Sequence, residues 1–338
     1  MASFANNVRN NCQYGATSYI IIVMPGETVQ STKIERSWLN LGEDYAGFSY
    51  QFPYIRITGA QPGKYALVTA AVHGDELNGI RIIQSLADEL AQFEISGQVT
   101  LLPVTNILGF HILSRYLPDR RDLNRLFPGN DAGSEGGRLA HYIWDNFVSM
   151  ADFGIDLHSA SYDRWNFPHI RGDMNNERVK ELASFFAAPV AMHSRGVKGS
   201  LRREATEQNI PFILLEAGEC NRFEPEISTQ ALGGIIRVLA HKGILPDAPA
   251  DMRKEPATNY FARSTWVRST VGGLFYPSVK AGAQVSRGQE IARIKSLLGE
   301  VKSVIAAPRN GIIIGYNLHP QVVPGRALFH LGYEEKSL

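Results

Sequence analysis

Between residues 54 and 244 the chain alternates short apolar runs with amphipathic segments, and this alternation limits the possible folds more than any other feature. Buried strands are predicted at 52–59, 64–72, 98–105, 153–157, 189–193 and 210–216. Apolar residues recur at helical spacing in stretches that begin at Ile80, Leu139, Val179 and Leu232. Strands that alternate with helices predict an α/β fold, in which helices flank a mostly parallel or mixed sheet.

The character of the sequence changes after residue 245. Segment 246–259 is rich in proline and polar residues, so we predict a linker there. Residues 260–338 contain short β-type runs separated by glycines, which indicate a smaller all-β, barrel-like domain. Residues 1–50 are interpreted as an N-terminal extension, ahead of a main domain at 51–245.

Charge and cysteine content restrict the partners and the compartment. The 34 Lys and Arg residues nearly balance the 33 Asp and Glu residues, so no broad field attracts nucleic acid or an anionic membrane. The apolar run 19–24 is too short to span a bilayer, and no secretion signal is recognisable. Cys12 and Cys220 cannot build a disulfide framework, which predicts a cytoplasmic protein.

A metal site is predicted where the apolar strands end. His73 and Glu76, in the stretch AAVHGDELNG, are three residues apart and can share one face of a helical turn, although ordinary turn chemistry would use the same residues. His158 ends the strand in GIDLHSA and supplies a third ligand, the usual number for catalytic zinc. Sites in open α/β sheets form at the carboxyl ends of strands, so we expect one zinc ion per chain here. Other divalent ions also bind such ligands.

Two further segments carry candidate chemistry. Charged residues surround Asn124 in SRYLPDRRDLNRLFPG, residues 114–129. This segment could be a solvated loop, but arginine forks and an asparagine amide beside a metal favour an anionic small molecule as the ligand. Glu216 follows an apolar strand in PFILLEAGEC. It could simply pair with an arginine, or it could act as a general base that takes a proton from metal-bound water.

The chain contains four motifs in the order HGDE, DLNR, DLHSA and LLEAGE. Together they resemble the succinylglutamate desuccinylase/aspartoacylase family, whose members are zinc-carboxypeptidase-like enzymes that cleave N-acyl amino acids. The resemblance covers roughly residues 50–245, and the C-terminal β region is similar to the domain added in that family. It implies a zinc-carboxypeptidase-like fold. It also implies that His73, Glu76 and His158 bind zinc and that Glu216 is the base.

The same resemblance implies roles for further polar residues. Asn124 and Arg125 would bind the substrate carboxylate, and Arg115 would polarise the scissile carbonyl. The gap between this arginine and DLNR is about two residues longer than in aspartoacylases, so Arg120 or Arg121 could take that role instead. Arg202, with Arg203 beside it, resembles another arginine that contacts substrate in bacterial members.

We therefore expect zinc-dependent hydrolysis of the amide bond of a small anionic N-acyl amino acid, with a zinc carboxypeptidase as the alternative. A β domain over the mouth of the site would admit only small substrates, whereas peptides need an open groove. Residues 260–338 also resemble lipoyl and biotinyl carrier barrels. However, Glu300 occupies the hairpin position where those carriers have the modified lysine. We therefore expect this domain to be a lid over the site or the assembly surface of a homo-oligomer. The acyl group and the amino acid stay open.

Overall fold

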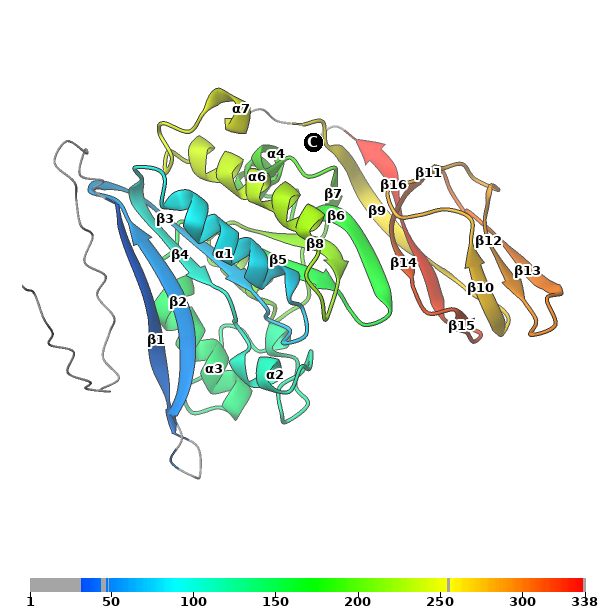
Figure 1. Ribbon diagram of the computed structural model, residues 1–338, viewed down its shortest axis with the longest axis horizontal. Helices are drawn as coiled ribbons and strands as arrows, with labels where there is room; N and C mark the ends of the chain where they lie inside the picture. Colours follow the sequence, from blue (N-terminus) through cyan, green and yellow to red (C-terminus); the bar gives the residue numbers. More distant parts are fainter. Residues whose placement is uncertain (1–31, 44–46, 48, 254–255, 337–338) are drawn as a thin grey trace, which may run out of the picture. The chain divides into compact units, whose positions relative to one another are not determined.

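The structure is a computed structural model that describes residues 32–43, 47, 49–253 and 256–336 (Figure 1). Most of the predicted N-terminal extension lies outside the described residues, as do Cys12 and the apolar run 19–24. The first strand of the described part begins at Lys33.

The helices are α1 Asn78–Leu90, α2 Ile107–His111, α3 Glu135–Ile143, α4 Glu177–Phe186, α5 Leu201–Glu207, α6 Pro225–His241 and α7 Ala250–Arg253, with a 3-10 helix η1 at Leu123–Arg125 and a π-helical turn at Trp144–Val148. Strands of the first part of the chain are β1 Lys33–Glu43, β2 Ser49–Thr58, β3 Gln61–Ala70, β4 Ser96–Leu102, β5 Phe153–Ala160, β6 Arg164–Gly172, β7 Val190–His193 and β8 Phe212–Glu219. The later strands are β9 Asn259–Arg268, β10 Gly273–Pro277, β11 Gln284–Val285, β12 Glu290–Lys295, β13 Val301–Ala306, β14 Gly311–Asn317, β15 Gln321–Val322 and β16 Ala327–Lys336. None of the helices in the described part is long and apolar enough to cross a membrane.

The described strands form two sheets. A 12-stranded sheet has the order β1-β2-β4-β3-β5-β8-β6-β7-β9-β16-β14-β11, and a four-stranded sheet has the order β13-β12-β10-β15. Strands β4, β3, β5 and β8 run parallel to one another, whereas β6 is antiparallel to β8. The expected mixed α/β sheet with a β-rich C-terminal region is therefore confirmed.

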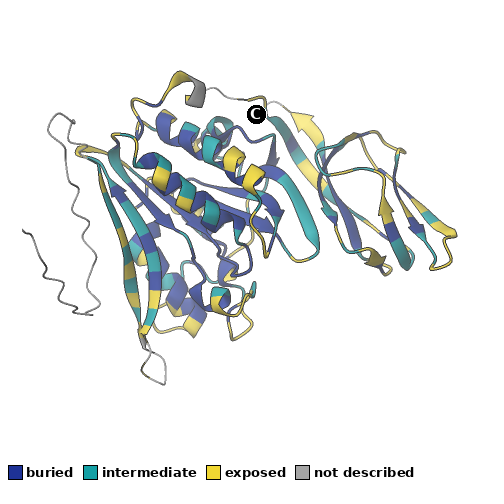
Figure 2. Cartoon of the chain, in the orientation of Figure 1, coloured by how far each residue is buried: buried dark blue, intermediate teal, exposed yellow. Residues whose placement is uncertain are grey.

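Helices cover both faces of the central strands, each over its own apolar core (Figures 1 and 2). On one face, α1, α4 and α6 bury side chains such as Leu86 and Leu239 against the sheet. On the other, α2, α3 and α5 contribute residues such as Ile143 and Leu201. The apolar stripe predicted from Ile80 onward is the buried face of α1. Burial on both faces explains why the central strands read as continuous apolar runs.

Three of the longer strands, β1, β6 and β9, were not predicted from the sequence, and neither were the two-residue strands β11 and β15. Strand β1 is an edge strand that pairs with β2, and its sequence, KIERSWLNLGE, has no regular alternation of polar and apolar residues. Strand β6 contains Pro168, and a proline inside a run argues against a strand. The structure accommodates Pro168 where the β6–β8 register shifts between Asn166 and His169, because a bulge needs no ladder hydrogen bond at that position.

The C-terminal strands close onto the central sheet. Strand β9 pairs with β7, β16 pairs with β9, β14 pairs with β16, and β14 also pairs with β6, which itself pairs with β7. These five strands form a closed ring around a small apolar core made of Val190, Met192, Phe261, Ile312 and Ile314. The segment predicted as a linker contains α7 and leads into β9. The chain thus passes from one region to the other without interrupting the sheet.

Phe261 is the residue whose loss should most weaken this ring. It is 1% exposed and belongs to a strand that pairs with both β7 and β16. Phe261→Ala should lower the free energy of unfolding by about 3–5 kcal/mol, because it removes a buried ring and leaves a cavity. Urea unfolding followed by fluorescence measures the change. Leu298→Ala, at a position 89% exposed, is the control and should change stability by less than about 0.5 kcal/mol; equal losses would contradict the packing role.

Candidate functional site

The carboxyl ends of three parallel strands, β3, β5 and β8, meet at one edge of the 12-stranded sheet. His73 and Glu76 lie in the turn between β3 and α1, and His158 lies near the end of β5. Glu216 lies near the end of β8, where the register pairs it directly with His158. The fold therefore brings together the three predicted metal ligands and the predicted base.

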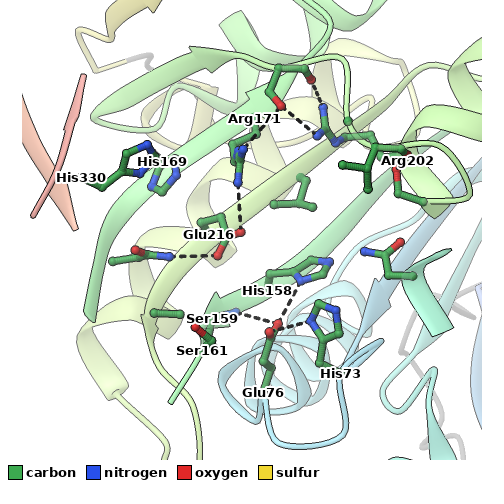
Figure 3. A pocket seen from close by; sticks show the side chains of 18 of the residues that line it. His73, Glu76, His158, Ser159, Ser161, His169, Arg171, Arg202, Glu216 and His330 are labelled. Carbon is green, nitrogen blue, oxygen red and sulfur yellow. Dashed lines mark hydrogen bonds and ion pairs between the residues drawn. The ribbon is translucent and has the colours of Figure 1, made fainter. Parts of the chain in front are cut away.

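His73, Glu76 and His158 form a buried cluster (Figure 3), which we call the metal cluster because its ligand atoms could hold a metal ion. Nδ1 of His73 lies 2.6 Å from Oε1 of Glu76, and Nδ1 of His158 lies 2.9 Å from Oε2 of the same carboxylate. One ligand atom from each residue lies within 4.8 Å of the others. Two imidazoles and a carboxylate are the ligand set of many catalytic zinc sites, which keep one position open.

Negative charge is in excess around the two imidazoles. Burial lowers the pKa of His158, but the carboxylates of Asp156 and Glu76 outweigh burial and hold it well above the ordinary value. In the same way, Glu76 and Asp122 outweigh burial and raise the pKa of His73. The cluster thus attracts positive charge into a buried position. A divalent cation would neutralise the same carboxylates, so both the ligand atoms and their charge fit a metal ion.

Asp156 holds His158 from the side opposite Glu76. Its Oδ2 lies 2.8 Å from Nε2 of His158, and the Thr69 hydroxyl donates to its Oδ1 at 2.7 Å. Asp156 is fully buried, so both contacts are shielded from water. A carboxylate on the far nitrogen fixes the ring orientation of a ligating histidine, here with Nδ1 toward Glu76. No role for Asp156 was predicted from the sequence.

Arg115 reaches the metal cluster from the loop after α2. Its Nη1 lies 3.2 Å from Nδ1 of His73 and 3.4 Å from Oε1 of Glu76, and its Nη2 donates to Asp122 at 3.1 Å. The side chain is 26% exposed. A fixed cation at this position lies where negative charge can be stabilised beside a metal.

Arg120 and Arg121, the two alternatives to Arg115, lie apart from the cluster. Both are exposed, and Arg121 lies 3.5 Å from Asp119 in a surface ion pair. Neither lines the pocket that contains the metal cluster, whereas Arg115 does. The geometry therefore favours Arg115 among the three.

Asn124 and Arg125 are presented by the 3-10 helix η1. Asp122 caps this helix by accepting from the Asn124 N–H at 2.9 Å. The side-chain oxygen of Asn124 accepts from the N–H of Leu201 at 2.9 Å, so the group that Asn124 can offer a ligand is its NH2. Arg125 donates to the carbonyl of Asn124 at 2.6 Å. Both side chains line the same pocket as the metal cluster.

Arg202 enters this pocket from α5. It is 5% exposed, donates to the carbonyl of Ser194 and has its Nη2 3.5 Å from the Ser194 hydroxyl. Burial, together with the charge of Arg171, lowers its pKa to about 10, so it remains a cation near neutral pH. The adjacent Arg203 turns away and bonds to Glu207 at 2.9 Å. Of the two neighbours, Arg202 is the one that lines the pocket.

Glu216 lies between the metal cluster and strand β6 (Figure 3). Its side chain is 15% exposed, and burial raises its pKa above the ordinary value of a glutamate. Asn166 donates to Oε2 at 3.0 Å, and Nη1 of Arg171 lies 3.7 Å from Oε1. A raised pKa moves a carboxylate toward the range that suits a general base.

One pocket of about 560 Å³, a volume typical of small-molecule sites, is lined by the three cluster residues together with Arg115, Asn124, Arg125, Asn166, Arg171, Arg202 and Glu216. Its charged lining residues are Arg115, Arg125, Arg164, Arg171, Arg195, Arg202, Glu76 and Glu216. Arginine is therefore in clear excess over glutamate. Such a lining favours an anionic ligand, as the sequence predicted.

One wall of the pocket was not predicted from the sequence. Strand β6 contributes Arg164, Asn166 and Arg171, and the C-terminal strands contribute Trp266 and His330. The rings of Trp266 and His330 stack at 4.3 Å with an angle of 8°, and the Arg164 guanidinium lies 4.8 Å from the Trp266 ring centre. The polar residues in β6 could have indicated this wall from the sequence. Nothing local in the sequence connects Trp266 or His330 to the site.

Comparisons with known proteins agree on one family. Residues 62–242 match the succinylglutamate desuccinylase/aspartoacylase catalytic domain. An N-alpha-acetyl-L-2,4-diaminobutyric acid deacetylase of Halomonas elongata is 30% identical over 267 residues, which cover 74% of this chain and 77% of that protein.

Two solved structures are similar over nearly the whole chain. The succinylglutamate desuccinylase/aspartoacylase of Rhodobacter sphaeroides has a TM-score of 0.76 at 25% identity, covering 90% of this chain and 96% of its own. The ectoine utilization protein EutE (DoeB) of Ruegeria pomeroyi, solved with bound product, has a TM-score of 0.77 at 24% identity, covering 93% and 98%. The similarity to EutE (DoeB) supports the fold of this chain.

Asp156→Asn should weaken binding of a divalent metal ion such as zinc at this candidate site by about 10- to 100-fold, because the far nitrogen of His158 loses its charged acceptor. Competition with a chromophoric chelator measures the affinity. His73→Ala removes a predicted ligand atom and is the reference for loss of the metal ion. Asp131→Asn, at an exposed position, is the matched control. Wild-type affinity in Asp156→Asn would contradict the orienting role.

Proposed function

The chain belongs to the succinylglutamate desuccinylase/aspartoacylase family, and on that basis we propose that it uses one zinc ion to hydrolyse the amide bond of small N-acyl amino acids. One observation carries the proposal: His73, Glu76, His158 and Glu216 converge at the carboxyl ends of β3, β5 and β8. Residues 51–245 would be the catalytic domain, with its sheet arranged as in zinc carboxypeptidases.

His73, Glu76 and His158 would hold the zinc ion. Bound there, zinc supplies a Lewis acid and lowers the pKa of a water molecule toward about 7. The chain itself keeps the ligands in place: Asp156 fixes the His158 ring, and the N–H of Ser159 donates to Oε2 of Glu76 at 3.1 Å. These supports limit the reorganisation that the site needs when it is loaded.

Glu216 would act as the general base. Its carboxylate removes a proton from the attacking water and delivers that proton to the leaving nitrogen, so the products are a carboxylate and a free amine. The pairing of Glu216 with His158 across β5 and β8 puts this carboxylate beside the metal cluster. Burial, which raises its pKa, strengthens this carboxylate as an acceptor of the proton from the attacking water.

The arginines and Asn124 would orient the substrate. Arg115 contacts the metal cluster and can stabilise negative charge that develops on the amide oxygen. The NH2 group of Asn124 and the guanidinium of Arg125 would bind the substrate carboxylate and set the scissile bond over the cluster. Arg202, a buried cation farther along the pocket, would contact a second polar group of the substrate.

The alternative is a zinc carboxypeptidase, which would use the same groups on peptide C-termini. The position of the C-terminal strands favours a deacylase, because Ser264, Trp266 and His330 line the same pocket as the metal cluster. A wall there suits a small substrate better than a peptide. In this view residues 246–259 are a linker, and the β domain at 260–338 limits the size of the substrate.

The direct test is release of primary amine from N-acetyl, N-succinyl and longer N-acyl amino acids and from short peptides, with zinc-loaded and chelator-treated protein. The panel should include N-alpha-acetyl-L-2,4-diaminobutyric acid, because the Halomonas elongata relative is named for it. We expect chelator-sensitive release from an N-acyl amino acid. Release from peptide C-termini alone would favour the carboxypeptidase.

Glu216→Gln should retain stoichiometric zinc and lower kcat by about 10²- to 10⁴-fold, the usual contribution of general-base assistance. Glutamine keeps the size of the side chain but cannot accept the proton. Turnover and metal content are measured on the same preparation. Wild-type turnover would remove Glu216 from the mechanism.

Trp266→Ala should widen the pocket. We expect kcat/KM for long-chain acyl or dipeptide substrates to rise relative to that for the smallest substrate by about 10-fold, the scale of discrimination by a few methylene groups. Trp38→Ala, on the exposed strand β1, is the matched control. An unchanged ratio in Trp266→Ala would argue against a size limit set by this wall.

A further inference from the structure

The carboxylate of Glu216 is contacted at both oxygens by side chains from β6 (Figure 3). Asn166 Nδ2 donates to Oε2 at 3.0 Å, and Arg171 Nη1 forms an ion pair with Oε1 at 3.7 Å. A carboxylate has about four lone-pair sites, so these two contacts leave acceptor sites for a proton. The contacts fix the orientation of the carboxylate and leave it able to accept a proton.

A bulge in β6 allows both side chains to point toward Glu216. Asn166 and Arg171 are five positions apart in the strand, an odd number, so a regular strand would direct them to opposite faces of the sheet. The pairing with β8 places His169 opposite Glu216 but Asn166 opposite Gly218, a shift of one residue. The extra residue returns Asn166 to the face that carries Arg171 and Glu216. Bulges next to active sites commonly redirect a side chain in this way.

The C-terminal strand β14 supports Asn166 from behind. Gly315 of β14 pairs with Asn166, and a Cβ atom at residue 315 would lie 2.5 Å from Oδ1 of Asn166 and 3.3 Å from the carbonyl of Trp165. The side-chain oxygen of Asn166 thus occupies the space that a glycine leaves open. With Oδ1 against Gly315, Nδ2 is the group that faces Glu216.

We propose that Asn166 is a positioning residue for Glu216, directed by the β6 bulge and supported by Gly315 of the C-terminal region. The inference rests on the proposed role of Glu216 as the base. Because Asn166 fixes the direction of the carboxylate, its loss leaves the base in place but poorly aimed at the attacking water. A hydrogen bond to a charged group corresponds to a rate change of about 10- to 100-fold.

The test is a double-mutant cycle of Asn166→Ala and Glu216→Gln, assayed with the panel substrate of highest kcat/KM. Asn166→Ala should lower kcat by about 10- to 100-fold, change KM by less than about threefold and leave the zinc content unchanged. In the Glu216→Gln background, the same substitution should cost less than about twofold, because the group through which Asn166 acts is already gone. Asn175→Ala, at an exposed position, is the matched control.

Gly315→Ala tests the same inference without touching the pocket lining. The new methyl group must displace the carboxamide of Asn166, so kcat should fall in the wild-type background and hardly change in Glu216→Gln. Gly272→Ala is the control, because a Cβ atom there meets its nearest neighbour at an ordinary 3.6 Å. Thermal unfolding of each variant verifies that the fold is intact.

Equal losses from Asn166→Ala in both backgrounds, or a loss that lies mainly in KM, would overturn the positioning role and leave Glu216 as the base. Wild-type turnover in Glu216→Gln, or silence across the panel, would overturn the proposed function and this inference with it. The two failures are therefore distinguishable.

Discussion

The parallel register of β3, β5 and β8 is the constraint on which the rest of the site depends. It aligns Ala70 with Leu157 and His158 with Glu216, so that the polar residues at the end of each apolar run emerge at the same edge of the sheet. The strands are held by apolar cores on both faces, which do not depend on the polar residues at the strand ends. A rigid apolar support thereby carries the charged site and holds its side chains in position.

Charge is distributed unevenly through the pocket. Carboxylates concentrate at its base, where Glu76 and Asp156 surround the imidazoles, and arginines concentrate on the remaining walls. This separation gives each end a different preference, a cation at the base and an anion along the walls. Arg115 lies at the boundary: it contacts Glu76 at the base, and it donates to Asp122, whose carboxylate also lies 3.7 Å from Arg125 of the walls.

The sequence predicted the central strands and the polar residues that meet at their ends, because both depend on local patterns. Apolar runs indicated the strands that precede His158 and Glu216. The polar residues at the ends of these runs indicated the site. The sequence did not predict β6, because Pro168 and the charged residues around it argue against a strand until the bulge is seen. Trp266 and His330 could not be placed either, since their positions depend on pairings between strands that are distant in the chain.

The closed ring of five strands has a consequence for how such a chain could be shortened or recombined. The segment before β9 is a boundary in the sequence but not in packing, since β7 and β6 find their outer partners in β9 and β14. A chain cut after α6 would expose two unpaired strand edges and the apolar side chains of Val190 and Met192. Exposed edges of this kind template association with other chains. The C-terminal region is therefore a structural requirement of the enzyme rather than a detachable appendage.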